Sequence, residues 1–233
     1  MWHFKKILRT FGFAEDGFIN PLNKNFMENT TSLWKSSVQK AFYGFIAFTV
    51  GGFLSGIASA VDRASSMASF MDGELSLGPS AFSIIASLIV IAGYVYYFIG
   101  INGMKKSLTG TPDFPAANNL YLGVLLGLIG SVVALIPFIG FLGTLCSFVG
   151  FIFMMIAFNK MKVSTTLPAS AVSGSSKLFV SMLLALIGGV LGLIPIAGGI
   201  LEAIMSIIVL IFGFMGWSAI AKSELQESNP AQE

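Results

Sequence analysis

The chain has 233 residues, of which 55% are hydrophobic and only 10% are charged, with a formal net charge of +2 and a mean hydropathy of +0.84. Soluble domains are typically about a quarter charged, so this composition excludes an ordinary water-soluble fold and indicates several membrane-spanning helices. A single cysteine excludes an intramolecular disulfide, and a single histidine leaves no side-chain set with metal-ligand spacing.

Residues 1–40 precede the first long apolar run and form an amino-terminal arm. Near its start, apolar residues recur at the i, i+3, i+4 and i+7 positions of one helical face, and basic residues flank that face. This pattern predicts an amphipathic helix in the interface of an anionic membrane leaflet. Its expected membrane-interface residues are Trp2, Phe4, Lys5, Lys6, Ile7, Leu8, Arg9 and Phe11. The alternative is a helix packed on the bundle or on a partner subunit.

Two helix-start signals follow within the arm. Asn20 before Pro21 is typical of a helix start. The hydroxyl run Thr30–Ser32 predicts a cap for the helix that contains Trp34. The arm lacks an apolar core and a small-residue cleavage site, so a secretory signal peptide is not predicted.

Six apolar segments are then long enough to cross a bilayer, for which about 20 residues are needed. The predicted fold class is therefore all-α, a polytopic membrane protein with six transmembrane helices and the amino-terminal amphipathic helix. The expected spans are Ala41–Val61, Ser80–Ile101, Asn118–Ile136, Gly140–Phe158, Leu178–Ile194 and Ile200–Ala221.

Lysine and arginine predict the orientation of these spans. Arg63 is the one basic residue expected on one side of the membrane, and all others fall on the side of residues 1–40, 102–117, 159–177 and 222–233. The positive-inside rule places that side, and both termini, in the cytoplasm. We expect the protein in a bacterial inner membrane, with the anionic cytoplasmic leaflet as its lipid partner.

The chain contains internal repeats. Leu120–Gly140 aligns with Leu178–Gly198 at a constant offset, and "NGMKKS" at Asn102–Ser107 aligns with "NKMKVS" at Asn159–Ser164. Such periodicity predicts consecutive copies of one structural unit. We interpret these copies as three hairpin repeats that surround a pseudo-threefold axis or lie side by side. The expected repeats are 41–107, 118–164 and 176–223, followed by a tail at 224–233.

The second and third hairpins share a Leu-Ile-Pro turn. Proline suits a helix start because its missing N–H has no partner there in any case. We therefore predict outer turns at Pro137 with Gly140 and at Pro195 with Gly198, where the glycines let the chain reverse. The first hairpin instead has a longer polar outer loop after Val61, which is either a contact site for a partner or an inert connection.

Glycine pairs four residues apart predict close helix packing, within the protein or against a neighbour. The pairs are Gly52 with Gly56, Gly123 with Gly127, and Gly188 with Gly192.

No phosphate-binding loop, carboxylate pair or activated nucleophile is found, so we predict no catalytic, cofactor-binding or metal-ligating residue. Glu202 is the one ionisable residue at the edge of a span, and we interpret it as an interfacial residue in the first turn of a helix. Tyr94, Tyr96, Tyr97 and Phe98 have the placement of an aromatic belt.

The hairpin pattern of residues 118–162, and more weakly 178–222, resembles small prokaryotic integral membrane families with glycine-rich Leu-Ile-Pro-type hairpins. That resemblance implies a helical membrane fold and no particular function. Mitochondrial carriers also combine three hairpins with prolines, but their prolines are coupled to charged residues, which Pro137 and Pro195 lack.

The function predicted from these features is non-catalytic: a structural or accessory subunit of a larger membrane complex, with other membrane proteins and not nucleic acid as partners. One alternative is a channel or transporter for a small solute or ion, and another is a hairpin protein that shapes membranes. A channel requires hydroxyl side chains that face a common axis. The available ones include Thr49, Ser55, Ser83, Ser87, Ser131, Thr144, Ser147 and Ser206.

Overall fold

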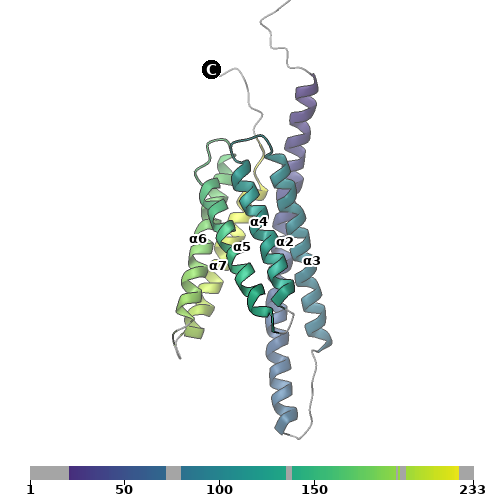
Figure 1. Cartoon of the computed structure of the whole chain (residues 1–233), viewed down its shortest axis with the longest axis vertical. Helices are drawn as coiled ribbons and strands as arrows, with labels where there is room; N and C mark the ends of the chain where they lie inside the picture. The colour runs from purple at the N-terminus through teal and green to yellow at the C-terminus, as the bar shows by residue number, and fades with distance from the viewer. Residues whose placement is uncertain (1–20, 72–79, 135–137, 193, 195–197, 226–233) are drawn as a thin grey trace, which may run out of the picture.

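The structure is a computed structural model that describes residues 21–71, 80–134, 138–192, 194 and 198–225. These residues form six α-helices and no strand (Figure 1). Each helix contains a stretch long and apolar enough to cross a membrane, which confirms the predicted all-helical class with six spans. The helices are α2 (Pro21–Met71), α3 (Ala81–Ser107), α4 (Phe114–Ala134), α5 (Gly140–Met161), α6 (Ala169–Leu191) and α7 (Gly198–Ala221).

Consecutive helices pack as three close pairs, α2 with α3, α4 with α5, and α6 with α7. Lighter contacts join α3 to α4, α5 to α6, and α7 back to α2. The six helices therefore form a ring in chain order, and the first helix is a neighbour of the last.

Within each pair, glycine lets two backbones approach closely. A Cβ atom built on Gly123 of α4 would lie 2.6 Å from the carbonyl oxygen of Gly150 on α5, and one on Gly174 of α6 would lie 2.6 Å from that of Gly216 on α7. No side chain fits at such distances. Close backbone contact replaces hydrophobic burial as a main source of helix association in lipid.

The ring is packed at one end and divergent at the other. We call the end formed by Ser107, Met161 and Ala221 the lysine-rich end, and the end formed by Ala81, Gly140 and Gly198 the opposite end. Figure 1 shows the α6–α7 pair diverging from the rest toward the opposite end. The fully buried large side chains concentrate at or near the lysine-rich end and include Trp34, Ile101, Met104, Leu108, Leu120, Met161, Trp217 and Ile220.

Large apolar side chains are exposed toward the opposite end, as expected for surfaces that face lipid rather than water. They include Ile84, Ile85, Leu88, Val132, Phe141, Leu142, Leu186, Ile187, Val190, Ile204 and Ile207.

Helix α2 is longer than the sequence predicted. It has 51 residues, which at 1.5 Å per residue is about 77 Å, more than twice the thickness of a bilayer core. The predicted span Ala41–Val61 is only its middle. The run Thr30–Ser32 lies inside the helix and does not cap it, so that prediction was wrong. Ser32 satisfies its hydroxyl locally by donating to the carbonyl of Asn29, which leaves the helix intact.

The polar segment after Val61 also continues α2, as far as Met71. Serines 65 and 66 each donate a hydrogen bond to the carbonyl oxygen of Asp62, so these polar residues are accommodated in helical geometry. The carboxylate of Asp62 then accepts a hydrogen bond from the backbone N–H of Ser80, just before α3 begins. Asp62 therefore ties the start of the second helix to the first.

Candidate functional site

Aromatic rings fill the lysine-rich end of the bundle, where the three helix pairs meet. The ring of Trp217 on α7 meets that of Tyr97 on α3 edge to face, with centroids 5.3 Å apart, and that of Phe158 on α5 with centroids 6.1 Å apart. Phe45 of α2 adds a tilted contact at 6.5 Å. Trp217 is only 2% exposed. Each helix pair thus contributes to one aromatic cluster.

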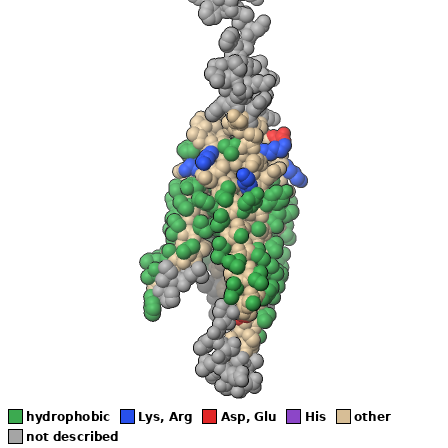
Figure 2. Space-filling view, turned by 90° about the vertical axis from the view of Figure 1, so that its right-hand side faces the viewer, with side chains coloured by type: hydrophobic (Ala, Val, Ile, Leu, Met, Phe, Trp, Pro, Cys, Tyr) green, Lys and Arg blue, Asp and Glu red, His purple; other side chains and the backbone are tan. Residues whose placement is uncertain are grey.

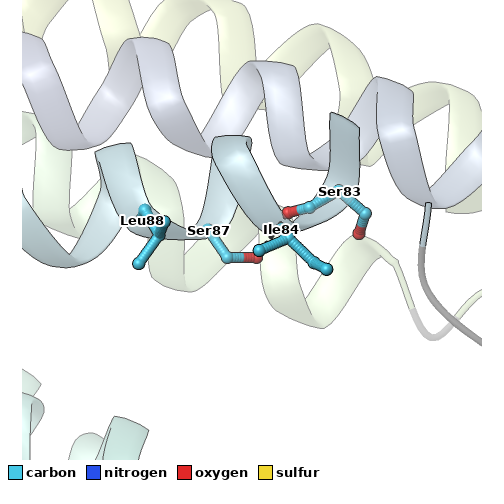
Figure 3. Close-up of a pocket in the computed structure, with 4 residues that line it drawn as sticks. All are labelled: Ser83, Ile84, Ser87 and Leu88. Atoms are coloured by element: carbon cyan, nitrogen blue, oxygen red, sulfur yellow. Dashed lines mark hydrogen bonds between the residues drawn. The ribbon is translucent and has the colours of Figure 1, made fainter. Parts of the chain in front are cut away.

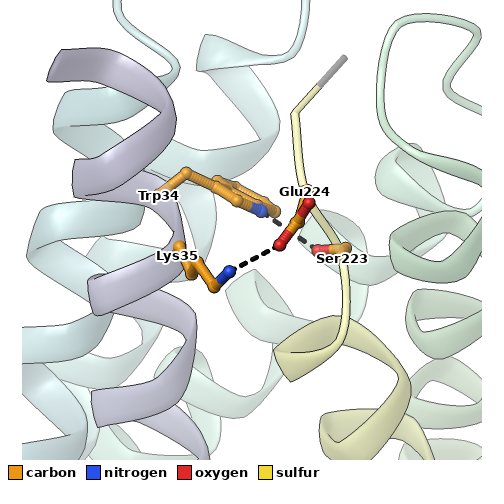
Figure 4. Close-up of polar contacts among 4 residues, drawn as sticks. All are labelled: Trp34, Lys35, Ser223 and Glu224. Atoms are coloured by element: carbon orange, nitrogen blue, oxygen red, sulfur yellow. Dashed lines mark hydrogen bonds and ion pairs between the residues drawn. The ribbon is translucent and has the colours of Figure 1, made fainter. Parts of the chain in front are cut away.

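We call the contact between one helix pair and the next a joint. The α7–α2 joint closes the ring of helices through two polar contacts (Figure 4). The indole N–H of Trp34 donates to the hydroxyl of Ser223 over 3.0 Å, in a buried position. The ammonium group of Lys35 pairs with Oε1 of Glu224 at 2.5 Å, where both side chains are exposed. This hydrogen bond and the positive charge of Lys35 lower the pKa of Glu224 from its ordinary value. Residues 189 positions apart in sequence are therefore joined directly.

The other two joints use a lysine over an aromatic ring. Lys105, near the end of α3, places its Nζ 4.2 Å from the ring centroid of Tyr121 on α4. Lys162, directly after α5, places its Nζ 3.7 Å from the ring centroid of Phe179 on α6. Lys105 aligns with Lys162 between the repeats, and Tyr121 aligns with Phe179. The two joints are therefore equivalent in both sequence and geometry.

Asp113 was not singled out from the sequence, yet it organises the loops at this end. Its side chain accepts hydrogen bonds from the hydroxyls of Ser164, at 2.8 Å, and Thr166. Asp113 is 8% exposed, and its own carbonyl accepts the backbone N–H groups of Ala116 and Ala117 at the start of α4. The available signal was a carboxylate in an otherwise basic loop region, next to a helix start. The hydrogen-bond donors to this carboxylate are hydroxyl groups, and no described lysine forms an ion pair with it.

Most membrane-embedded hydroxyls for which a contact is seen bond to their own helix. Ser87 donates to the carbonyl of Ser83, and Ser131 and Thr144 each donate to the carbonyl four residues earlier. Ser147 packs against Gly130 of α4, where a Cβ would lie 2.2 Å from its hydroxyl oxygen. These side chains are used in local and interhelical packing.

A shallow hollow of about 210 Å³ lies on α3 near the opposite end. Ser83, Ile84, Ser87 and Leu88 line it, and Figure 3 shows them together on one side of the helix. The lining contains no ionisable group. It therefore offers no group for acid–base chemistry or metal ligation.

The predicted turn residues fall partly inside the described chain. Pro137 and Pro195, like interface residues 2–11, lie outside the described residues. Gly140 and Gly198 are the first residues of α5 and α7. The left-handed conformation before α5 belongs to Phe138, with φ 70° and a fully exposed side chain. The residues just before Phe138 lie outside the described chain, and the role of Gly140 in the turn stays a prediction.

The three predicted glycine pairs differ in what covers them. A Cβ on Gly123 would meet α5, one on Gly127 would lie 2.4 Å from the hydroxyl of Tyr94, and one on Gly188 would lie 3.0 Å from Met205. Around Gly52 and Gly56 on α2, by contrast, no described atom lies within 4 Å of such a Cβ. Only this last pair is uncovered.

Glu202 is exposed and lies in the second turn of α7, because that helix begins at Gly198. Its Oε2 lies 2.8 Å from where a Cβ of Gly192 would be, so the missing side chain of Gly192 leaves it room. The predicted place in the first turn is wrong, because α7 begins two residues earlier than expected and Glu202 is its fifth residue. The helix dipole acts mainly within the first turn.

Within the described part of the chain, no three His, Cys, Asp or Glu side chains come together as a metal site would require. Comparison with known proteins adds no relative: no family model, no curated protein and no solved structure matches the chain.

Proposed function

We propose that the protein is a non-catalytic membrane protein that acts as a structural or accessory subunit of a larger membrane complex. The observation that carries this proposal is the uncovered Gly52–Gly56 pair. Gly123, Gly150, Gly174 and Gly216 support close contacts between helices of this chain, whereas α2 presents glycines with no helix against them.

The surface around the uncovered pair suits a transmembrane helix from another subunit. Gly52 and Gly56 are followed at the same four-residue spacing by Ala60 and Ala64, both exposed. Beside this strip of small residues lies a ridge formed by Phe53, Ile57 and Val61, which are 72%, 43% and 56% exposed. Small residues let a neighbouring backbone approach, and the ridge supplies van der Waals contact.

The repeat organisation is part of this proposal, and three equivalent contacts support it. In each pair, a small residue of the first helix lies against a carbonyl of the second. A Cβ on Gly44 would lie 2.9 Å from the carbonyl oxygen of Gly93, Gly123 makes the corresponding contact with α5, and Ser181 donates to the carbonyl of Val209 at 2.9 Å. Ser181 occupies the position of Gly123 in the repeat alignment. We interpret the ring as three hairpins around a pseudo-threefold axis.

In this proposal the lysine-rich end, the amphipathic amino-terminal helix and both chain termini face the cytoplasm, and the membrane is a bacterial inner membrane. Twelve of the thirteen Lys and Arg residues fall on that side by sequence, which supports the orientation.

The test combines extraction in a gentle detergent with mass measurement of the intact assembly. The wild-type chain is expected to leave the membrane with another subunit in fixed stoichiometry. The double variant Gly52→Leu, Gly56→Leu is expected to lose that subunit because its side chains block close approach.

The matched control for this experiment is Gly189→Leu. Gly189 on α6 is also open, with no atom within 4 Å of a built Cβ, and this variant is expected to keep the partner subunit. A wild-type chain that is monomeric or purely homo-oligomeric would refute the proposal, as would full retention of the partner by the double variant.

The ring arrangement favours a channel or transporter as the second candidate. In that candidate function, the aromatic cluster around Trp217 closes the path of the solute or ion. Solute or ion flux in liposomes that contain only this chain, increased by Trp217→Ala, would support that candidate over the accessory subunit.

A further inference from the structure

The lysines at the lysine-rich end mostly lack acidic partners. Of those whose side chains the structure describes, only Lys35 forms an ion pair. The acidic side chains described at this end are Glu224, which takes Lys35, and Asp113, which is bonded to hydroxyls. Figure 2 shows lysine side chains in a band at the border of the apolar surface. The lysines without an ion pair are Lys40, Lys105, Lys106, Lys160, Lys162, Lys177 and Lys222.

Two of these lysines are held at the joints between helix pairs. The ring of Tyr121 fixes the ammonium of Lys105 at the α3–α4 joint, and that of Phe179 fixes Lys162 at the α5–α6 joint. A lysine ammonium carries three N–H donors, and a ring on one side of it leaves donors available on the other side. No described acceptor bonds to either ammonium, so each joint presents a positioned cation whose donors are open.

The membrane-facing surface beside each of these two joints is apolar. Ile99 lies six residues before Lys105 and is 48% exposed, and Ile156 lies six residues before Lys162 and is 39% exposed. Six helical residues span about 9 Å along the axis, the distance from a lipid headgroup to the upper part of its acyl chains, and about 120° around it, so each isoleucine lies on the face of the helix next to that of the lysine. Ile99 and Ile156 are aligned between the repeats, as the two lysines are.

We propose that the α3–α4 and α5–α6 joints each bind the phosphate of an anionic phospholipid, whose acyl chains extend over the adjoining apolar face that carries the exposed isoleucine. Charge complementarity identifies the headgroup, and the apolar surface identifies a lipid rather than a free anion. The inference goes beyond the accessory role and does not depend on a partner subunit.

The α7–α2 joint is the internal comparison. Its lysine, Lys35, is already neutralised by Glu224 at 2.5 Å. The carboxylate would repel a phosphate brought to the same place. The chain therefore has two joints open to an anionic headgroup and one joint closed to it.

The experiment measures lipid binding to the purified chain in detergent by native mass spectrometry, with phosphatidylglycerol and phosphatidylcholine as probes. The wild type is expected to retain two phosphatidylglycerol molecules in preference to phosphatidylcholine. The variant Lys105→Gln, Lys162→Gln is expected to bind phosphatidylglycerol about fivefold more weakly at each joint, since a lysine near the surface contributes that much.

Two control variants separate charge from structure. Lys35→Gln is expected to bind phosphatidylglycerol like the wild type. Lys105→Arg, Lys162→Arg keeps both cations over their rings and is expected to retain binding. If the glutamine variant does not fold, the wild type still provides a test, because its retention of phosphatidylglycerol must fall as salt rises.

Several results would overturn the proposal. They are equal retention of the two lipids by the wild type, unchanged binding by the glutamine variant, or an equal loss in Lys35→Gln. Displacement of the lipid by millimolar inorganic phosphate would also overturn it, because the joints would then be sites for a free anion.

Discussion

Trp217 is the residue on which the closed end depends most. Its ring contacts aromatic rings from α2, α3 and α5, while Trp34 fastens the same end through Ser223. A side chain that touches every helix pair links the stability of each pair to that of the others. The packing there is dense, so truncation leaves a cavity that the surroundings fill only in part.

We expect Trp217→Ala to lower the free energy of unfolding by about 3–5 kcal/mol, the usual cost of truncating a buried large aromatic residue. Equilibrium unfolding of the purified protein in mixed micelles measures it. Phe141→Ala is the control, since Phe141 is 70% exposed and its loss leaves no cavity. Equal destabilisation by the two variants would contradict the role of Trp217.

Glu224 makes the stability of the α7–α2 joint depend on pH. The hydrogen bond and charge of Lys35 hold the pKa of this carboxyl below its ordinary value, so the pair contributes stability above that ordinary value. The contribution is lost as the pH falls through the lowered pKa in the folded state. It is small, because both partners are exposed to solvent.

We therefore expect Glu224→Gln to reduce the unfolding midpoint slightly at pH 7 and to match the wild type in acid, below the lowered pKa. Thermal unfolding followed by circular dichroism across this pH range tests the prediction. A difference that persists unchanged in acid would show that the ion pair is not its cause.

At the scale of the helices, backbone contact across each pair determines which positions accept a side chain. Gly123 and Gly189 are both helical glycines, but only Gly123 faces another backbone. Alanine favours a helix over glycine by about 1 kcal/mol when nothing obstructs its methyl group. The same substitution should therefore have opposite effects at the two positions.

We expect Gly123→Ala to lower the free energy of unfolding by about 1–3 kcal/mol, since the methyl group would push α4 and α5 apart. Gly189→Ala should leave it unchanged or raise it by up to about 1 kcal/mol. Unfolding of both variants in the same micelles provides the comparison. A stabilising Gly123→Ala would mean that α4 and α5 are not in close contact.

At the scale of the whole molecule, the ring has two chemically different ends. Lysines surround the packed end, whereas the divergent end carries exposed apolar side chains and the extension of α2 to Met71. In the proposed orientation, which follows the positive-inside rule, the packed end faces the cytoplasm.

We expect a cysteine at Lys106 to be labelled by a membrane-impermeant reagent only after cells are opened, and one at Ala64 to be labelled in intact cells. Both variants carry Cys146→Ala, which removes the native thiol. The opposite labelling pattern would reverse the proposed orientation, while the fold would be unaffected.

The number of spans could be predicted from sequence, but several of their ends could not. Transfer of an apolar segment into lipid depends on the sum over its own residues, so the spans are evident from composition alone. The ends of α2 depend on whether polar residues such as Ser32 and Asp62 find local hydrogen bonds within a helix, which composition does not reveal.

The surfaces proposed as contact sites show the same contrast between what local sequence predicts and what packing decides. The sequence by itself determined the membrane class, the six spans and the grouping of the lysines at one end of the bundle, because these properties are local sums of transfer free energy and charge. Only the tertiary structure decided that Gly123 is covered and Gly52 is not, although their sequence patterns are alike. It also decided that Trp34 meets Ser223, because packing depends on which distant residues come together in space.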